Sequence, residues 1–451
     1  MSKKKKDKGY ESDSYPNILS DIVAESQIPL IFHDRDSKQG VHKVLSLFSG
    51  CGGMDLGFEG HFIASRKSFG NNSQLVHHVI DDDWVFLKKT KFQTVFANDI
   101  LPAAEMAWTT YMSRFGYSEG IYHCASIVDL VKMHQAGAKV FPEDIDIVTG
   151  GFPCQDFSVA GKRLGFDSSK DDMGKHRSAD KPSEESRGKL YFWMKQVIDI
   201  ARPKIFVAEN VKGLVNLGNV KNIIQQDFAS AGGGGYIVLS PQVLHAGNYG
   251  IPESRERVIF IGIRRDALQP ETLKVLESDV IPNKYNPYPY ATHACTVKKD
   301  GLLPPVTTYD VLKNLPEPED SIDLSQQTYS KAKYLPNGSQ GQIEIRLDRI
   351  GPTIRSEHHG NIEFRRLSAE HGGKHIEELA KGMKERRLTP RECALIQTFP
   401  PDYRFVMKKT GCRYLLSPSN AYKIIGNAVP PVLAYRLAMR LEELWPLYFG
   451  E

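Results

Sequence analysis

The segment GGFPCQDFSVAG, residues 150–161, sets one cysteine between a proline and a glutamine, directly after an apolar run. A thiolate is a strong nucleophile, and glycines and a proline beside it suit a thiol that is exposed on a tight turn and aimed at a substrate. The alternative is an inert core cysteine, the commonest state of an unpaired one. The polar Gln155 after Cys154 counts against a core position. The segment therefore predicts nucleophilic chemistry at Cys154.

Two groups nearer the amino end could hold a nucleotide-like ligand. Gly50, Gly52 and Gly53 stand between a strand-like and a helix-like segment, and such a turn lets backbone approach a ligand closely. A glycine turn in any α/β protein would look the same, and the spacing is not that of the dinucleotide fingerprint. The next strand-like segment ends at Asp99, whose carboxylate could accept hydrogen bonds from two ribose hydroxyls or could cap the helix before Pro102.

Charged side chains follow two later strand-like segments. Glu209 ends the run PKIFVAEN, where a partly buried carboxyl group could serve as a proton donor, although a strand-end acid in solvent is the simpler reading. Arg255 and Arg257 are two residues apart at the entry to a strand, so they share a face. Paired guanidinium groups suit a phosphate or a polarised carbonyl, and the alternative is a surface ion pair with Glu253 or Glu256.

The elements that must position these groups alternate in type along the chain. Strand-like segments cover 41–48, 94–98, 144–150, 203–210 and 257–264, and helix-like segments cover 103–115, 220–232 and 420–445. This alternation predicts a doubly wound, mostly parallel sheet. The carboxyl ends of parallel strands meet at one edge of the sheet, so the candidate residues are expected to converge there.

Length and composition indicate more than one domain. The chain has 451 residues, is 41% hydrophobic and carries a formal net charge of +4. After Arg265 the pattern becomes irregular and rich in proline, tyrosine and charge. We predict an amino-terminal extension (1–40), a catalytic domain (41–265 plus 420–451) and a smaller irregular domain (266–419) that includes an ordered, motif-bearing hinge (386–404).

Cysteine usage and apolar runs exclude several classes of protein. The six cysteines are scattered, so neither a disulfide framework nor a standard zinc site is expected. A loose metal alternative combines His371 and His375 with Cys393 and Cys412, but it lacks paired-ligand spacing and a polar loop is the simpler reading. No apolar run approaches the roughly 20 residues of a membrane helix, and the lysine-rich start lacks the apolar stretch of a secretory signal. A cytoplasmic location is expected.

The motifs follow one another in an order that resembles the DNA (cytosine-5-)-methyltransferases of bacterial restriction–modification systems. The chain carries FxGxGG, PCQ, ENV, RxR, LTPRE and GNAVPP in that order, within residues 41–265 and 386–440. Amino-group methyltransferases have a different tetrapeptide where this chain has PCQ. The resemblance implies an α/β fold with a Rossmann-like S-adenosylmethionine-dependent methyltransferase sheet of seven strands and an antiparallel hairpin edge. It also implies a smaller irregular α+β target-recognition domain and a carboxyl-terminal helix that folds back beside the first strand.

The resemblance also implies the reaction and its catalytic residues. In this family a cysteine adds to carbon 6 of cytosine, which activates carbon 5 to take the methyl group of S-adenosylmethionine. Here Cys154 would be the nucleophile, Glu209 would hold ring nitrogen 3 and the exocyclic amine, and Arg257 would bind the base carbonyl. Asn210 would support the turn at Glu209, and Arg255 would support the site or bind a phosphate. The implied catalytic set is Cys154, Gln155, Glu209, Asn210, Arg255 and Arg257.

For the cofactor, the resemblance implies Phe48, Gly50, Cys51, Gly52, Gly53, Asp99, Ile100, Ser126, Ile127, Gly151, Pro153, Leu190, Asn427, Ala428 and Val429. Two departures from the family pattern stand out. Ser126 occupies a place where an aspartate usually binds the adenine amine. Glu253 occupies the place of the glutamine that usually precedes the two arginines. Each departure puts the usual contact of that position in doubt.

Duplex DNA is the implied partner, and its target base must leave the helix for a thiol to reach carbon 6. The segment after Cys154, which runs through Lys162, Arg163 and the polar insert 167–186 to Arg187, is expected to close over that base. The second domain would read sequence in the major groove, although a charged loop region is the simpler reading. The implied DNA-binding residues are Lys162, Arg163, Arg346, Arg349, Arg355, His358, His359, Arg365 and Arg366.

The resemblance further implies a monomer that acts at the bacterial nucleoid, with a cognate restriction endonuclease for the same site as a second partner, and with no metal or membrane. Two rival functions stay open. A transfer-RNA methyltransferase shares the fold and most motifs, although the CFT element of that branch is missing. A catalytically silent DNA-binding relative need not keep Cys154, Glu209 and Arg257 together, whereas this chain has all three.

Overall fold

The computed structural model describes residues 40–70, 73–117, 120–153, 190–216, 219–329, 343–356, 363–409 and 413–451. Several of the predicted features lie outside the described residues. They are nearly all of the extension 1–40, the insert 167–186, Cys154, Gln155, Lys162, Arg163, His358, His359 and Cys412.

The main sheet of the described chain has eight strands. Seven follow one another in the order β10-β11-β8-β7-β1-β5-β6, and β9 pairs with β11 on the edge opposite β8. The strands from β8 to β6 are parallel, whereas β11 runs antiparallel to β8, β9 and β10. The doubly wound, mostly parallel sheet with an antiparallel edge is therefore confirmed, with the short β9 added to the seven expected strands. The bounds are β1 His42–Leu47, β5 Phe92–Asp99, β6 Tyr122–Cys124, β7 Ile147–Gly151, β8 Ile205–Val211, β9 Tyr236–Val238, β10 Gln242–His245 and β11 Glu256–Arg264.

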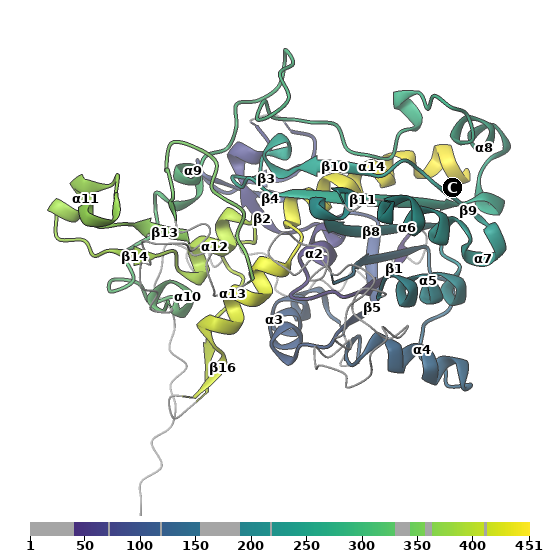
Figure 1. Ribbon diagram of the computed structural model, residues 1–451, viewed down its shortest axis with the longest axis horizontal. Coiled ribbons are helices and arrows are strands. Elements are labelled where there is room, and N and C mark those ends of the chain that lie inside the picture. Colours follow the sequence, from purple (N-terminus) through teal and green to yellow (C-terminus); the bar gives the residue numbers. More distant parts are fainter. Residues whose placement is uncertain are drawn as a thin grey trace, which may run out of the picture.

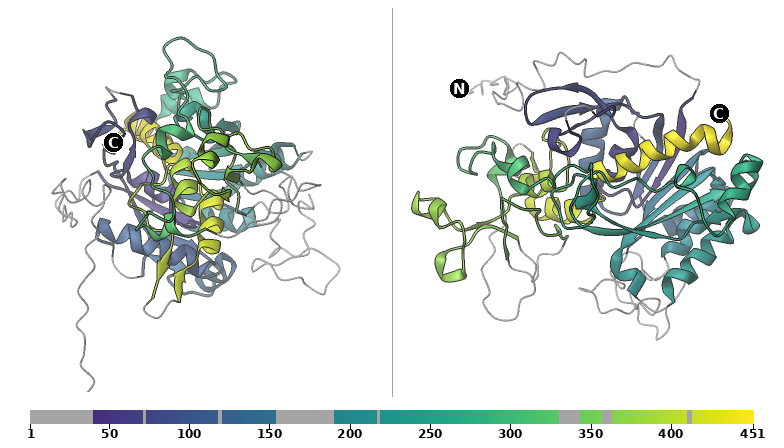
Figure 2. Two further views of the ribbon diagram at one scale, coloured as in Figure 1. Left: turned by 90° about the vertical axis from the view of Figure 1, so that its left-hand side faces the viewer. Right: turned by 90° about the horizontal axis from the view of Figure 1, so that it is seen from above.

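Helices cover both faces of this sheet because its strands are apolar on both sides. In β1, Val44 belongs to one buried cluster, whereas Leu45 and Leu47 belong to the other. The first cluster includes side chains of α2, α3 and α14, and the second includes those of α4, α5 and α6. Figure 2 shows α14, in yellow, on the opposite side from α5 and α6. The bounds are α2 Gly53–Glu59, α3 Pro102–Met112, α4 Ile127–Gln135, α5 Leu190–Ala201, α6 Val220–Ala229, α7 Ala231–Gly234 and α14 Pro431–Phe449.

The helix-like stretch 420–445 forms two helices instead of one. α13 (Pro418–Asn427) ends before Pro430, and α14 begins at Pro431, which occupies its first turn. Proline lacks a backbone donor and is favoured at such a start. Trp445 of α14 stacks on His42 of β1, with ring centroids 3.9 Å apart, so this helix does fold back beside the first strand.

The smaller irregular domain lies to the left of the main sheet in Figure 1. Its elements are short: α9 Thr308–Leu312, α10 Leu324–Gln327, β12 Ile343–Glu344, β13 Glu363–Arg366, α11 Ile376–Ala380, β14 Arg386–Arg387, α12 Pro390–Ile396, β15 Met407–Lys408 and β16 Tyr414–Leu416. The motif LTPRE begins α12, where Thr389 and Glu392 form a capping box around Pro390.

Two other parts of the chain lie against α14. α8 (Pro270–Leu276) is joined to it by hydrogen bonds from the Gln269 N–H to the Tyr448 carbonyl and from the Thr272 hydroxyl to the Leu447 carbonyl, both 2.8 Å. A three-stranded sheet that the sequence patterns did not predict, β2 (Ile63–Ser65), β4 (Trp84–Leu87) and β3 (Val76–Val79), is tied to α14 through the Tyr435 hydroxyl. The predicted domain boundaries remain a prediction.

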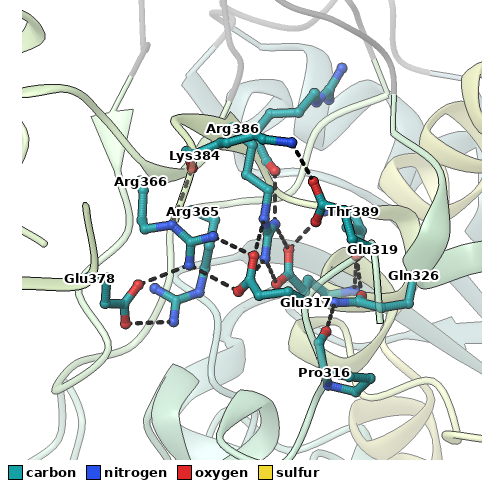
Figure 3. A network of polar contacts seen from close by, with 12 residues as sticks. Pro316, Glu317, Glu319, Gln326, Arg365, Arg366, Glu378, Lys384, Arg386 and Thr389 are labelled. Carbon is teal, nitrogen blue, oxygen red and sulfur yellow. Dashed lines mark hydrogen bonds and ion pairs between the residues drawn. The ribbon is translucent and has the colours of Figure 1, made fainter. Parts of the chain in front are cut away.

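A buried ion-pair network stabilises the smaller domain (Figure 3). Arg366 is fully buried and donates to Glu317 at 3.0 Å and to Glu378 at 2.9 Å. Arg386 also pairs with Glu317 at 3.1 Å, and it donates to both oxygens of Glu392 at 2.8 and 2.9 Å. The expectation that Arg366 contacts DNA is therefore wrong, because its guanidinium is inaccessible and already paired with carboxylates.

Substituting Glu317 with glutamine is expected to lower the free energy of unfolding by about 2 kcal/mol, since hydrogen bonds to charged groups contribute about 1.5–3 kcal/mol. Burial alone would raise the pKa of Glu317, but hydrogen bonds from Arg366 and Arg386 outweigh it and lower the pKa to about 2. The stabilisation is therefore complete above the unfolded-state pKa near 4.5 and is lost as the pH falls toward about 2. Denaturant unfolding of both proteins between pH 6 and pH 3 should show the difference shrinking on acidification.

The matched control is Glu319→Gln. Glu319 pairs with the exposed Lys384 at 3.0 Å, and exposed pairs contribute little. Equal losses for Glu317→Gln and Glu319→Gln, or a difference that does not depend on pH, would contradict the stabilising role of the network.

Candidate active site

A pocket of about 520 Å³ lies at the carboxyl ends of β1, β5, β7 and β8. Sites for small ligands commonly occupy this edge of an α/β sheet and have volumes of about 300–1,000 Å³. The pocket brings together most of the predicted residues. Those that line it are Phe48, Gly50, Asp99, Ile100, Ser126, Ile127, Gly151, Pro153, Leu190, Glu209, Asn210, Arg257, Arg355, Asn427, Ala428 and Val429.

The turn after β1 forms one wall of the pocket. Phe48 and Gly50 line it and have positive φ values of 53° and 54°. A left-handed conformation is rare for phenylalanine, so the sharp turn is imposed by its surroundings. The Ser49 N–H donates to the Asn98 carbonyl at 2.8 Å, and the Asn98 N–H donates to the Ser49 hydroxyl at 3.1 Å. These reciprocal bonds join the ends of β1 and β5.

Three residues of the same motif do not line the pocket. Cys51 is buried and directs its thiol at the Ile424 carbonyl, 3.3 Å away. A Cβ on Gly52 would lie 2.6 Å from a ring carbon of Trp108, and one on Gly53 would lie 2.2 Å from the Val429 carbonyl. Glycine at 52 and 53 allows this close packing, and the predicted contact of the three residues with a cofactor stays a prediction.

Asp99 lies where β5 meets this turn. One of its carboxylate oxygens accepts from the Gly50 N–H and the other from the Leu101 N–H, both at 3.0 Å. The N-cap of α3 is Leu101, so Asp99 is not the cap. Burial raises the pKa of Asp99, although hydrogen bonds from the Leu101 and Gly50 backbone oppose the shift. The carboxylate is thus held rigidly at the pocket wall.

Ser126 begins α4 and lines the pocket beside Ile127. Its hydroxyl accepts from the Val128 N–H at 3.2 Å. A serine at this position is a favoured N-cap. The side chain therefore caps the helix, as a short polar residue can.

Glu209 and Arg257 form an ion pair at the other end of the pocket. Arg257 Nε lies 2.6 Å from a Glu209 carboxylate oxygen, and both side chains are largely buried. The register explains the contact: Glu209 opposes Ile259 and Arg257 opposes Val211, so the two are diagonal neighbours on one face. Burial raises the pKa of Glu209, and the positive charges of Arg257 and Arg255 oppose this shift.

Gly151 and Asn210 shape the turn that leads to the predicted nucleophile. A Cβ on Gly151 would lie 2.9 Å from a Glu209 carboxylate oxygen, so glycine makes room for that acid. The Asn210 amide donates to the Phe152 carbonyl at 3.2 Å. Pro153 lines the pocket, and Cys154 is the next residue. Asn210 thereby fixes the backbone immediately before Cys154.

Arg255 does not share the environment of Arg257. It is 1% exposed, and it donates to the carbonyls of Ile354, Gly426 and Ala428 at 3.0, 2.8 and 2.8 Å. A phosphate contact is excluded because these partners and burial occupy the guanidinium. The alternative of a surface ion pair is also wrong, since the Glu253 carboxylate beside it is fully buried.

The remaining predicted DNA-binding residues of the described chain are separated in space. Arg355 is exposed and lines the pocket. Arg346 pairs with Asp348 at 2.7 Å and Arg365 pairs with Glu378 at 3.0 Å, whereas Arg349 is exposed. Only Arg355 therefore lies at the pocket.

Some pocket residues were not predicted. Lys423 is exposed, lines the pocket and lies four residues before Asn427 on α13, a spacing that places both on one helix face. The helical period of this segment could have revealed it. Thr353, Ile354 and Ser356 also line the pocket, but they come from an irregular segment whose sequence carries no such signal.

The loose metal alternative finds no support at its histidines. His371 contacts Glu385 at 2.8 Å and His375 contacts the Ile345 carbonyl at 2.9 Å. No group of three or more metal-ligating side chains occurs in the part of the chain that the structure describes. Within the same part, no helix is long and apolar enough to cross a membrane.

Comparison with protein families identifies the chain. A sequence model of the C-5 cytosine-specific DNA methylase family matches residues 83–443. The protein belongs to this family. It is similar to the type II methyltransferase M.BsuRI of Bacillus subtilis, with 32% identity over 98% of this chain and 90% of the relative. It is also similar to M.BspRI of Lysinibacillus sphaericus, with 31% identity over 90% of this chain and 82% of the relative.

The enzyme is therefore a DNA (cytosine-5-)-methyltransferase of the restriction–modification type, as the motif order indicated. Solved structures agree on the fold. The DNMT2 of Spodoptera frugiperda and the Dnmt2 methyltransferase of S. pombe each have a TM-score of 0.50, at 18% and 17% identity, over 89% of this chain and 99% of theirs. The match to a DNA methylase family favours DNA over transfer RNA as the substrate.

Proposed function

We propose that this DNA methyltransferase acts through a covalent adduct between Cys154 and carbon 6 of a cytosine flipped out of duplex DNA. The observation that carries the proposal is the buried Glu209–Arg257 pair, 2.6 Å apart, beside the turn that leads to Cys154. An acid and a guanidinium in one pocket offer a proton donor for ring nitrogen 3 and a ligand for the ring carbonyl. Nucleophilic addition to a cytosine ring needs both groups.

Each residue has a defined part in this mechanism. The Cys154 thiolate forms a bond to carbon 6, and the ring electrons shift toward nitrogen 3, where protonated Glu209 donates its proton. Arg257 binds the carbonyl oxygen on carbon 2. Carbon 5, now enamine-like, takes a methyl group, and nitrogen 3 returns its proton to the Glu209 carboxylate. Carbon 5 then loses its own proton to solvent water as the carbon 6–sulfur bond breaks, so that the thiolate leaves and aromaticity returns. Asn210 keeps the backbone before Cys154 in place through its bond to Phe152.

The opposite end of the pocket is assigned to S-adenosylmethionine, which supplies an electrophilic methyl group when bound and leaves as S-adenosylhomocysteine. Phe48, Ile100 and Leu190 offer apolar walls for the adenosine, and Asp99 would accept from the ribose hydroxyls. Asn427 to Val429 close the pocket from the carboxyl-terminal side. Gly52 and Gly53 allow the turn to pack, and contact of Cys51, Gly52 and Gly53 with the cofactor stays a prediction.

Replacing Asp99 with asparagine is expected to weaken binding of S-adenosylmethionine ten-fold or more, because a charged acceptor contributes about 1.5–3 kcal/mol per hydrogen bond. Asparagine keeps one oxygen for the Gly50 or Leu101 N–H, so the turn should persist. Isothermal titration calorimetry without DNA measures the dissociation constant. The matched control is Asp129→Asn, which changes an acid of α4 that does not line the pocket. An unchanged dissociation constant for Asp99→Asn would remove Asp99 from the cofactor site.

DNA is proposed to lie across the pocket mouth, where the smaller domain meets the catalytic sheet. Arg355 is the predicted DNA-binding residue best placed to contact a phosphate near the target base, and Arg349 is exposed for contact farther away. Sequence recognition is assigned to the smaller domain, with Lys162, Arg163, His358 and His359 as further candidates. We also propose that a cognate restriction endonuclease cleaves the same site. The methyltransferase itself is proposed to act as a monomer at the cytoplasmic nucleoid.

The test is expression of the enzyme in a host that lacks cytosine methylation, followed by bisulfite sequencing of its genome. The expected result is 5-methylcytosine at one position of one recurring duplex sequence. A duplex containing 5-fluorocytosine at that position should then form a denaturation-resistant complex with the enzyme. Methylation of transfer RNA in place of duplex DNA, or methylation with no trapped complex, would contradict the proposal.

A further inference from the structure

The segment that leads into β11, the strand that carries Arg257, is hydrogen-bonded to the smaller domain. This contact between residues 252–255 and 351–356 is called the joint. Glu253 and Gly351 form a parallel bridge. The Ser254 N–H donates to the Gly351 carbonyl at 2.8 Å, and the Gly351 N–H donates to the Pro252 carbonyl at 2.9 Å. Residues 351–356 therefore run beside the entry to β11.

The Glu253 side chain strengthens this joint from within. It is fully buried, and one carboxylate oxygen accepts from the Ile354 N–H at 2.7 Å. The same oxygen lies 3.4 Å from a terminal nitrogen of Arg255. The second oxygen has no hydrogen-bond partner among the described residues. The first oxygen thus makes both contacts.

Arg255 extends the joint to a third segment, the end of α13. It donates to the Ile354 carbonyl on one side and to the Gly426 and Ala428 carbonyls on the other. Residues 355 and 426 are in close backbone contact, because a Cβ on Gly426 would lie 2.2 Å from the carbonyl carbon of Arg355. The two side chains of the joint therefore hold three chain segments together.

All three segments form one side of the pocket. Thr353, Ile354 and Arg355 line it, as do Gly426 and Ala428. The strand β11 contributes Arg257, which pairs with Glu209. A shift of residues 353–356 would therefore change the wall that faces the proposed base, whereas Asp99 and Phe48 belong to other segments, β5 and the β1 turn.

We propose that Glu253 is a positioning residue that fixes residues 353–356 against the catalytic strand, so that Arg355 is held at the pocket mouth for DNA. The inference rests on the proposed function of the pocket. The carboxylate oxygen that accepts from Ile354 carries this role. The second carboxylate oxygen is dispensable for this role, because it has no hydrogen-bond partner among the described residues. Glutamine can supply the same acceptor and alanine cannot.

The test compares Glu253→Ala with Glu253→Gln in steady-state methylation of a duplex that contains the target site. Glu253→Ala should lower kcat/KM for DNA by about ten-fold or more, which corresponds to the roughly 1–3 kcal/mol cost of an unsatisfied buried group. Glu253→Gln should restore kcat/KM to within about three-fold of the wild type. The dissociation constant of S-adenosylmethionine should stay within about two-fold in both variants.

Glu442→Ala is the matched control. The Glu442 carboxylate also accepts a backbone N–H, that of Lys91 at 2.8 Å, but it lies on α14 away from the pocket. This control should leave kcat/KM for DNA unchanged. Wild-type kinetics for Glu253→Ala, an equal loss in Glu253→Gln, or an equal loss of cofactor binding would each overturn the inference.

Arg255→Lys provides a second route if Glu253→Ala does not fold. Lysine keeps the charge but cannot bridge Ile354 to Gly426 and Ala428, so a loss of kcat/KM for DNA is expected, and wild-type kinetics would overturn the inference. Failure of the covalent mechanism can be distinguished from failure of this inference, because it would appear as methylation by a variant that lacks the Cys154 thiol. The Glu253 comparison is made between variants that retain that thiol.

Discussion

Cys154→Ser is expected to abolish methylation of duplex DNA while leaving binding of DNA and S-adenosylmethionine largely intact. A serine hydroxyl is far less ionised than a thiol at neutral pH and adds to carbon 6 much more slowly. Loss of a nucleophile typically lowers turnover by about four orders of magnitude or more. Single-turnover methylation with tritiated S-adenosylmethionine measures the loss, and titration with DNA and with cofactor measures binding.

The matched control is Cys295→Ser, which changes a partly buried free cysteine that does not line the pocket. That variant should methylate at the wild-type rate. Trapping with 5-fluorocytosine DNA should succeed for the wild type and for Cys295→Ser and fail for Cys154→Ser. Turnover near the wild-type rate by Cys154→Ser would rule out covalent catalysis by this residue.

Glu209→Gln is expected to have the second largest effect, a fall in kcat of about a hundred-fold or more, since a positioned general acid typically contributes about 10²–10⁴-fold. Glutamine keeps a hydrogen bond to Arg257 and to the base, but it has no proton to give to ring nitrogen 3. Burial raises the pKa of Glu209, which keeps more of it protonated toward neutral pH. Activity of the wild type should therefore fall as the pH rises through that pKa.

pH profiles of the single-turnover rate constant test this assignment. The limb on which activity falls with rising pH should be present in the wild type and absent in Glu209→Gln. Glu277→Gln, which changes an exposed acid paired with Arg265 away from the pocket, should keep the wild-type profile. An unchanged alkaline limb in Glu209→Gln would assign the proton transfer to another group.

The sequence by itself determined the main sheet and the placement of most of the pocket. Apolar runs such as 41–48 and 203–210 predicted β1 and β8, because a strand buried on both faces has to be apolar along its whole length. Asp99, Glu209 and Arg257 could be assigned to one site, because parallel strands bring their carboxyl ends to a common edge. The glycine before FPCQ, by contrast, has a tertiary cause, since Gly151 leaves space for the Glu209 carboxylate of the neighbouring strand.

Other properties depend on contacts between segments far apart in the chain. Arg255 and Arg257 are two residues apart at the entry to β11, yet Arg255 is buried by segments about 100 and 170 residues later, whereas Arg257 lines the pocket. Arg366 had the residue type of a DNA contact but is enclosed by Glu317 and Glu378.

Residue type and the local periodicity of the sequence indicate what a side chain can bind, but they do not indicate which partner the fold places beside it. Burial of a charge is favourable only where tertiary structure supplies compensating carboxylates or carbonyls. Only the packing of the smaller domain against β11 and α13 therefore decided which arginines face the pocket and which hold the protein together.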